Sequence, residues 1–289
     1  MRTASPQRRA WRKSVNMVML AMTGVFTLIV VAPLIWILAY VAKEGWPALS
    51  LRFFTELPTP VGVPGGGIAN ALVGSLMTVG LGLLVAGPIG VLVGIYAAMF
   101  PNSAAAVAVR FATDVIAGVP SIVMGIFAYT LVVVPTRNFS ALSGGLVLSF
   151  IMVPIIVRTT EEMIRLVPAS LREGSLALGA SEGKTSLSVV LPAALNGLVT
   201  GIMLAVARAA GEAAPMLFTA FGNPFMNLNY LQPVATLPHT IFIYAISPYA
   251  DWHAKAWATA LVLIAIILLL NVLARLLVWW RTRRLGTVR

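Results

Sequence analysis

Two residues with full charges lie within an otherwise apolar part of the sequence. The stretch ARAAGEAAP, residues 207–215, places Arg208 and Glu212 four residues apart. No other charge occurs after Lys184 and before Asp251. A charge at the centre of a bilayer costs roughly 2.5–3.5 kcal/mol on insertion scales, so a pair at this depth needs a physical reason. At this spacing two side chains share one face of a helix, where they can act together.

The pair of Arg208 and Glu212 admits two interpretations. In the structural one, the charges form an internal ion pair that lets the helix insert, or that locks it to a neighbouring helix. In the functional one, they line a transport pathway, which is the usual reason for an ionisable residue inside a membrane. Pro215 follows three residues later and predicts a kink or break, which would free backbone groups to line a cavity.

The composition is that of a polytopic membrane protein. The 289 residues are 59% hydrophobic and only 10% charged, whereas soluble domains carry about 25% charged residues. The net charge of +11 does not indicate a nucleic-acid partner, because the basic residues lie in tails and short loops, as the positive-inside rule requires. The absence of cysteine excludes disulfides, thiolate catalysis and cysteine-ligated metals.

The apolar runs predict six membrane-spanning helices, since each span needs about 20 mostly apolar residues. The first run is too long for a signal peptide, whose apolar region is about 7–15 residues. The expected helices are Val15–Val41, Ile68–Met99, Val115–Val134, Leu142–Val157, Ala193–Ala220 and Ala256–Trp280. We therefore predict an all-α polytopic membrane protein with one six-helix domain over residues 15–280. Basic tails, residues 1–14 and 281–289, flank this domain.

The basic residues also predict the orientation of the chain. With six spans, 14 Lys and Arg residues lie on the side of both termini and 4 on the other side. The richer side is expected to be cytoplasmic. This places both termini in the cytoplasm, and it makes residues 158–192 the longest cytoplasmic segment.

The cytoplasmic segment contains a predicted helix and an apparent nucleotide motif. The stretch PASLREGSLALGA reads as a helix that ends near Gly179. The stretch GASEGKT, residues 179–185, resembles a phosphate-binding loop, but it has three residues between its glycines instead of four and no preceding strand. We conclude that this chain has no nucleotide site and that any ATPase is a separate chain.

A spaced pattern in the same segment resembles the cytoplasmic signature loop of permease subunits of bacterial ATP-binding-cassette importers. The residues that carry it are Glu173, Gly174, Ser175, Gly179, Val189, Leu191 and Pro192. The family signature has two alanines after the glutamate, where this chain has two other small residues, and an isoleucine in place of the valine. The resemblance implies a type I importer permease fold in which the loop forms short helices that dock into the ATPase, with the turn at Gly179.

The same resemblance implies a set of partners. A permease of this class has no catalytic residues or cofactors of its own. ATP is used by a dimer of ATP-binding-cassette subunits, a second related permease completes the pathway, and an extracytoplasmic binding protein delivers the substrate. Whether this chain pairs with itself or with a second permease stays open.

Further stretches resemble the A-type permease of the phosphate-specific transport system. They are GGGIANALVGSLMTV, AGVPSIVMGIFAY, VPIIVRTTEEMIRLVP and AVARAAGEAAPMLFTA, and together they cover roughly residues 65–220. This resemblance implies import of inorganic phosphate and a role in phosphate movement for Arg208 and Glu212. Another oxyanion, such as phosphonate, sulfate or molybdate, is the alternative within the same class.

A phosphate substrate would explain why Arg208 and Glu212 lie within the membrane. It is a dianion near neutral pH, and the planar donor fork of Arg208 fits its oxygens. Glu212 would hold the fork until the anion arrives, or accept a hydrogen bond from a protonated phosphate oxygen. Each charge entering against 100 mV costs roughly 2.3 kcal/mol, so uptake of a dianion into a negative-inside cell requires an energy source.

The remaining charged residues have simpler expected roles. Asp114 is predicted to open the third helix and to favour its N-terminus. Glu161 and Glu162 are predicted to form surface pairs with Arg158 or Arg165.

Two other function classes, a membrane-embedded enzyme and a structural scaffold, find less support in the sequence. The enzyme would need a nucleophile with a base, or metal ligands, within the spans, and the spans contain neither cysteine nor histidine. His239 and His253 are far apart and external, so we predict no metal site. The scaffold leaves the deep charges without a purpose. The external stretch of residues 223–248, rich in Pro, Asn and aromatic residues, is expected to be a re-entrant or interfacial element or a docking surface for the binding protein.

Overall fold

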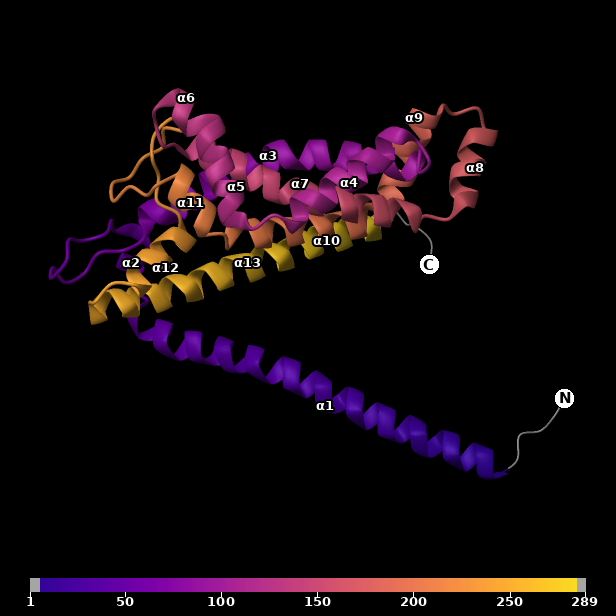
Figure 1. The fold of residues 1–289 in the computed structure, drawn as a ribbon, viewed down its shortest axis with the longest axis horizontal. Coiled ribbons are helices and arrows are strands. Elements are labelled where there is room, and N and C mark those ends of the chain that lie inside the picture. Colours follow the sequence, from indigo (N-terminus) through magenta and orange to yellow (C-terminus); the bar gives the residue numbers. More distant parts are fainter. Residues whose placement is uncertain (1–5, 285–289) are drawn as a thin grey trace.

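The computed structural model describes residues 6–284, and the regular secondary structure in that range is helical. Apart from the first, which diverges from the rest, its long helices run side by side along the length of the molecule (Figure 1). Within these residues there is no strand, only an isolated bridge between Phe221 and Val234. The long helices are α1 (Pro6–Gly45), α3 (Ala69–Met99), α4 (Ala104–Gly118), α7 (Ala141–Arg165), α10 (Leu191–Ala210) and α13 (Ala250–Arg284).

Short helices connect the long ones at both ends of the molecule. At the end that contains the start of α1 and the end of α13 lie α8 (Ala169–Ala177) and α9 (Glu182–Thr185) (Figure 1). The opposite end contains α2 (Leu51–Thr55), α6 (Val134–Thr136), α11 (Ala214–Thr219) and α12 (Leu237–Ala245). The start of α1 and the end of α13 therefore lie at the same end as the segment predicted to be cytoplasmic.

Five helical segments are long and apolar enough to cross a membrane, and a sixth span is possible from a bent pair. The five contain α1, α3, α7, α10 and α13. The pair consists of residues 104–118 and 121–136, and the chain direction bends by 104° between them. The all-α polytopic fold is thus confirmed, while the single straight third helix expected over residues 115–134 is wrong.

The bend in the third span has a local cause. Pro120 lacks the amide hydrogen that would continue the helix, and its ring disfavours the helical conformation at Val119. Val119 is accordingly extended, with φ −74° and ψ 130°. A new helix, α5 (Ser121–Ala128), begins after it and continues through a π-helical turn, η2 (Tyr129–Val133), into α6.

Other helix bounds also differ from the prediction. Helix α7 continues eight residues beyond Val157, so Arg158 to Arg165 are helical and not part of a loop. The expected fifth helix is broken after Ala210, and α11 follows as a separate helix. The second helix agrees closely, since α3 ends at Met99 as expected.

The core lies where α3, α7 and α10 pack together. Gly90 and Gly94 of α3 face Ile156 and Thr160 of α7, and an added Cβ would lie 2.7 and 2.6 Å from those side chains. Small residues allow this close approach of membrane helices, which associate through packing and not through the hydrophobic effect. The core therefore holds α7 firmly against α3, and α7 provides one wall of the site described below.

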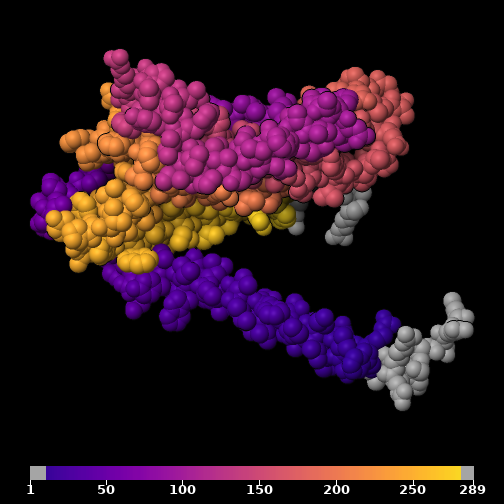
Figure 2. All heavy atoms as spheres, in the orientation of Figure 1, coloured from indigo at the N-terminus to yellow at the C-terminus, as the bar shows by residue number. Residues whose placement is uncertain are grey.

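Helix α1 lies apart from the core. Its residues from Trp11 to Tyr40 are all exposed, and it meets α13 only near its C-terminal end (Figure 2). Most of these residues are apolar. In a bilayer this surface is covered by lipid or by another subunit.

Candidate transport-pathway site

Arg208 and Glu212 lie on either side of a helix end. Arg208 belongs to the last turn of α10, where a cation interacts favourably with the helix dipole. The helix ends at Ala210, and Glu212 lies in the following break, with its backbone N–H donating to the Ala209 carbonyl. The predicted interruption near Pro215 is present as a break of α10 from α11.

The two side chains form a loose pair. Nε of Arg208 lies 3.9 Å from Oε1 of Glu212, and the side chains are 57% and 18% exposed. Because the helix ends between them, they do not share one helix face as the spacing predicted. The guanidinium therefore retains donors for another partner.

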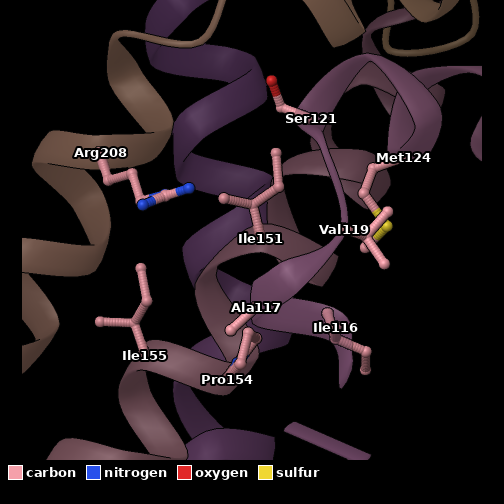
Figure 3. Close-up of a pocket in the computed structure, with 9 residues that line it drawn as sticks. All are labelled: Ile116, Ala117, Val119, Ser121, Met124, Ile151, Pro154, Ile155 and Arg208. Atoms are coloured by element: carbon pink, nitrogen blue, oxygen red, sulfur yellow. The ribbon is translucent and has the colours of Figure 1, made fainter. Parts of the chain in front are cut away.

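Arg208 reaches into a small cavity between three segments (Figure 3). The cavity measures about 60 Å³, more than the roughly 10–15 Å³ needed for one water molecule. Its lining residues are Ile116, Ala117, Val119, Ser121, Met124, Ile151, Pro154, Ile155 and Arg208. Among them only the arginine and the serine carry polar side chains, so the walls are apolar around one full charge.

The cavity owes its shape to both interrupted helices. The break around Val119 and Pro120 contributes one wall, and the end of α10 contributes the guanidinium of Arg208. Ser121 stands at the start of α5, on the other side of the break. Ser121 and the break were missed in the sequence, although the stretch GVPS contained the signal, a glycine and a proline within an apolar run.

The segment between α7 and α10, predicted to be cytoplasmic, forms two short helices around a turn. Gly179 lies between α8 and α9 with φ +84°, a conformation that favours glycine. Ser175 Oγ lies 2.9 Å from Thr185 Oγ1, and Arg172 Nη2 lies 3.3 Å from Glu182 Oε2, which ties the two helices together. The stretch GASEGKT thus forms this turn and α9, without a preceding strand.

The signature residues lie on both arms of this segment. Glu173, Gly174 and Ser175 belong to α8, and Leu191 and Pro192 begin α10. An added Cβ at Gly174 would meet nothing within 4 Å, so the departure from alanine requires no change in packing. No residue of α8 is buried. The segment presents an exposed surface, and its docking role stays a prediction.

Comparisons with known proteins now decide the family. Residues 90–283 match the family described as "Binding-protein-dependent transport system inner membrane component". The chain belongs to this family. A phosphate transport system permease protein PstA of Haemophilus influenzae is 42% identical over 96% of this chain and 98% of its own. The PstA of Yersinia pestis is 41% identical over 94% and 92% of the two chains.

More distant relatives agree with the family and the fold. The probable PstA of Methanocaldococcus jannaschii is 36% identical over 87% of this chain and 89% of its own. Among solved structures, an inward-facing conformation of the MetNI methionine ABC transporter has a TM-score of 0.56, 19% identity and coverage of 73% of this chain and 93% of that chain. The expected fold of an importer permease is confirmed. The chain is a multi-pass membrane permease of a multi-subunit transport system.

A second charged cluster in the permease surrounds Glu161 on α7. Its carboxylate Oε1 accepts from Arg110 Nε at 2.7 Å and lies 2.6 Å from Arg165 Nη2, and its side chain is only 6% exposed. The expected surface pairing of Glu161 is therefore wrong, although Arg165 is one of its partners. Arg110, 51 residues away on α4, was missed because no local pattern signals so distant a contact.

Asp114 and Arg158 form a separate pair. Asp114 lies inside α4, which begins at Ala104 after the cap residue Ser103, so it does not open a helix. Its carboxylate contacts the Arg158 guanidinium of α7. Glu162 is exposed.

The end of the permease opposite α8 and α9 bears an apolar loop and a cavity. The loop of residues 221–236 carries no charge, and several of its large side chains are exposed, among them Phe225, Leu228 and Leu231. A cavity of about 790 Å³ lies beside it, against α12. Hydrogen bonds from Asn223 and Asn227 to the Pro233 carbonyl hold the loop in shape.

The two histidines lie near this end but do not form a metal site. His239 packs against Gly222, and burial lowers the pKa of its imidazole, so it is neutral at neutral pH. His253 contacts the Ser247 carbonyl at 2.6 Å. Within the described part of the chain, no group of three His, Cys, Asp or Glu side chains is placed to hold a metal ion.

Proposed function

We propose that this chain is the permease subunit of an ATP-driven importer that moves inorganic phosphate across the bacterial cytoplasmic membrane. The observation that carries the proposal is the half-exposed guanidinium of Arg208 in an apolar-walled cavity between two broken helices. The high identity to phosphate permeases over most of the chain supports phosphate over phosphonate, sulfate or molybdate.

The geometry at Arg208 suits the capture of an oxyanion. Its guanidinium can form two parallel charge-assisted hydrogen bonds with phosphate oxygens. Apolar walls exclude water and strengthen such interactions, because charges interact more strongly in a low dielectric. The loose contact with Glu212 keeps the fork oriented and can be exchanged for the anion. Ser121 offers a hydroxyl donor on the opposite wall.

Glu212 then has a defined part in the cycle. As a carboxylate it repels a dianion and attracts Arg208, so the empty site keeps its charge balanced. When phosphate binds, the guanidinium turns to the anion. Glu212 can then accept a hydrogen bond from a protonated phosphate oxygen, which favours the singly protonated form over anions without a proton.

The permease requires partners for this work. ATP binding and hydrolysis belong to an ATP-binding-cassette dimer that docks on the exposed surface of α8 and α9, with Glu173 to Ser175, Gly179, Leu191 and Pro192 as the coupling residues. A second, related permease covers the open side of Arg208 and part of α1. An extracytoplasmic phosphate-binding protein docks on the external loop of residues 221–236. Both termini are cytoplasmic.

Uptake by the reconstituted transporter tests the proposal. The complex is placed in proteoliposomes with ATP inside and binding protein outside, and entry of radiolabelled phosphate is measured with sulfate, molybdate or a phosphonate as competitor. We expect ATP-dependent phosphate uptake that a tenfold excess of the other oxyanions leaves unchanged. Absence of phosphate uptake, together with ATP-dependent uptake of one of the other oxyanions when that oxyanion is labelled, would assign a different cargo to the same site.

A further inference from the structure

Arg110 joins three segments of the permease through one side chain. Its Nε donates to Glu161 Oε1 of α7 at 2.7 Å, its Nη1 to the Pro101 carbonyl at 2.9 Å, and its Nη2 to the Ala97 carbonyl at 2.9 Å. Ala97 belongs to the last turn of α3, whose carbonyls lack partners within the helix. All three guanidinium nitrogens are thus occupied, in contrast to those of Arg208.

The acceptor in this cluster is held from a second direction as well. Arg165, one turn beyond Glu161 on α7, contacts the same carboxylate oxygen at 2.6 Å. Glu161 is nearly fully buried, and the Arg110 side chain is largely buried. A buried carboxylate that two guanidinium groups share holds its surroundings in one arrangement, because any displacement leaves a charge without its partner.

A ladder of contacts runs from this cluster toward the Arg208 cavity. The first rung is Arg110 with Glu161. The second is Asp114 with Arg158, four residues further along α4 and three residues back along α7. Beyond it, residues 116–117 of α4 and 154–155 of α7 line the cavity. Helices α4 and α7 therefore run antiparallel in a fixed register from the cluster to the site.

The same cluster lies next to the α8–α9 segment. Helix α7 ends at Arg165, and α8 begins four residues later at Ala169. In the other direction, α4 ends at Gly118, where Val119 and Pro120 interrupt the helix. Helix α4 is thus joined to α7 near α8, and the chain can bend at Pro120. In this arrangement α4 can move as a rigid body about the break that follows it.

We infer that Arg110 is a positioning residue that transmits movement of the α8–α9 segment to the wall of the Arg208 cavity. The inference rests on the proposed function, since it assumes that α8 and α9 receive the ATPase. When α7 moves with α8, the Arg110 contacts carry α4 with it. The displacement is absorbed at Val119 and Pro120, and the cavity around Arg208 changes shape.

The first experiment separates transmission from a purely structural role. Phosphate uptake and ATP hydrolysis are measured per assembled complex in proteoliposomes for Arg110→Gln and Arg110→Lys, with Arg52→Gln as the matched control. Arg52 is an exposed arginine whose Nε lies 3.8 Å from Oε1 of Glu56. Arg165 remains beside Glu161 in every variant, so the carboxylate keeps a partner and assembly is preserved.

A transmission role predicts a change in the ratio of phosphate moved to ATP hydrolysed. We expect the ratio to fall about tenfold in Arg110→Gln, and less in Arg110→Lys, because a single ammonium reaches Glu161 but cannot span all three acceptors. Arg52→Gln should keep the wild-type ratio. An unchanged ratio in Arg110→Gln, with or without less assembled protein, would overturn the inference.

A second measurement does not depend on phosphate. The chain contains no cysteine, so Ser121→Cys introduces a single thiol on the cavity wall. Its reaction rate with a maleimide is measured with and without a non-hydrolysable ATP analogue. We expect the analogue to change the rate at least threefold with Arg110 present, to have no effect in the Arg110→Gln background, and to have a smaller effect in the Arg110→Lys background.

The outcomes of the labelling experiment are decisive. A nucleotide effect that survives both Arg110 substitutions, or that is absent when Arg110 is present, would overturn the transmission role. If the nucleotide effect depends on Arg110 but no phosphate enters the proteoliposomes, the coupling inference holds and the assigned cargo fails. The two proposals therefore fail in different experiments.

Discussion

Two pairs of opposite charges in this permease have the same spacing in sequence and opposite geometries. Glu161 and Arg165 lie four residues apart, as do Arg208 and Glu212. The first pair is tight at 2.6 Å and its carboxylate is buried, whereas the second is loose at 3.9 Å with a half-exposed guanidinium. The difference lies in the backbone.

The backbone sets the distance between the charged side chains, because only one of the two pairs lies within a continuous helix. Helix α7 continues through Arg165 and keeps the two side chains on one face. Helix α10 ends at Ala210, between Arg208 and Glu212, so that pair is stretched. A distant third residue, Arg110, then completes the Glu161 cluster. The same residue types hold helices together in one place and leave a guanidinium half exposed in the other.

Loss of the carboxylate of Glu161 is expected to have the largest effect on stability. Glu161→Gln leaves Arg110 and Arg165 facing each other without a shared anion, and breaking a buried pair in this way costs about 3–5 kcal/mol. We expect a sharp fall in assembled complex and in its thermal midpoint in detergent. Arg52→Gln, at an exposed pair, serves as the control. If Glu161→Gln were as stable as the wild type, the cluster would not contribute to the stability of the complex.

Arg208→Lys is expected to show the largest effect on transport with little change in stability. The substitution keeps the charge but removes the fork. The ammonium still donates one bond, so the loss of one charge-assisted hydrogen bond of about 1.5–3 kcal/mol predicts a roughly 10- to 100-fold drop in phosphate uptake per assembled complex, since each 1.4 kcal/mol corresponds to a factor of ten. Arg208→Gln, which also loses the charge, should be at least as inactive. The measurement is the initial rate of uptake, normalised to complex retained on purification.

A double variant addresses the structural interpretation of the same pair. Arg208→Leu with Glu212→Leu removes both charges, so the segment should insert and assemble readily. If the pair serves only to hold helices, this variant keeps transporting phosphate. We expect assembled complexes without uptake, and normal uptake would remove Arg208 and Glu212 from the pathway.

Parts of the fold could be predicted from the sequence, and other parts could not. The lengths of apolar runs predicted the all-helical fold, and α3 ends at the expected residue because FPNS stops it in sequence. The bend at Val119 was not expected, because apolar spans tolerate proline and the run contains no polar stop. Arg110 could not be assigned to Glu161, since the contact joins residues 51 positions apart.

The candidate site was predictable in its charges but not in its surroundings. A deep Arg208 stands out in any apolar run, and Pro215 indicated the interruption that follows it. The opposite wall depends on how α4 and α5 pack against α7, which no local pattern specifies. For the same reason Asp114 was assigned to a helix start, although Ser103 caps α4 eleven residues earlier.

A substitution at the turn between α8 and α9 is expected to have a moderate effect on recovery of the ATPase. Gly179 has φ +84°, and a β-branched residue in that region costs about 1–3 kcal/mol. Gly179→Val should insert normally but lose much of the ATPase on purification, because the angle between α8 and α9 changes. Gly174→Ala is the matched control, since its Cβ meets nothing within 4 Å. Equal ATPase recovery from both variants would argue against the docking role.

The smallest effect is expected from Glu212→Gln, which sharpens the contrast with Glu161→Gln. A loose, partly exposed pair contributes about 0–1 kcal/mol, and the amide keeps the shape of the side chain. The backbone contact of Glu212 with Ala209 is unaffected. We therefore expect a small change in the thermal midpoint. The loss of uptake should be much smaller than in Arg208→Lys, because the guanidinium of Arg208 remains and loses only the carboxylate that it contacts in the empty site. If Glu212→Gln instead reduces assembled complex as strongly as Glu161→Gln, then Arg208 and Glu212 are a structural pair after all, and the open geometry at the end of α10 does not serve transport.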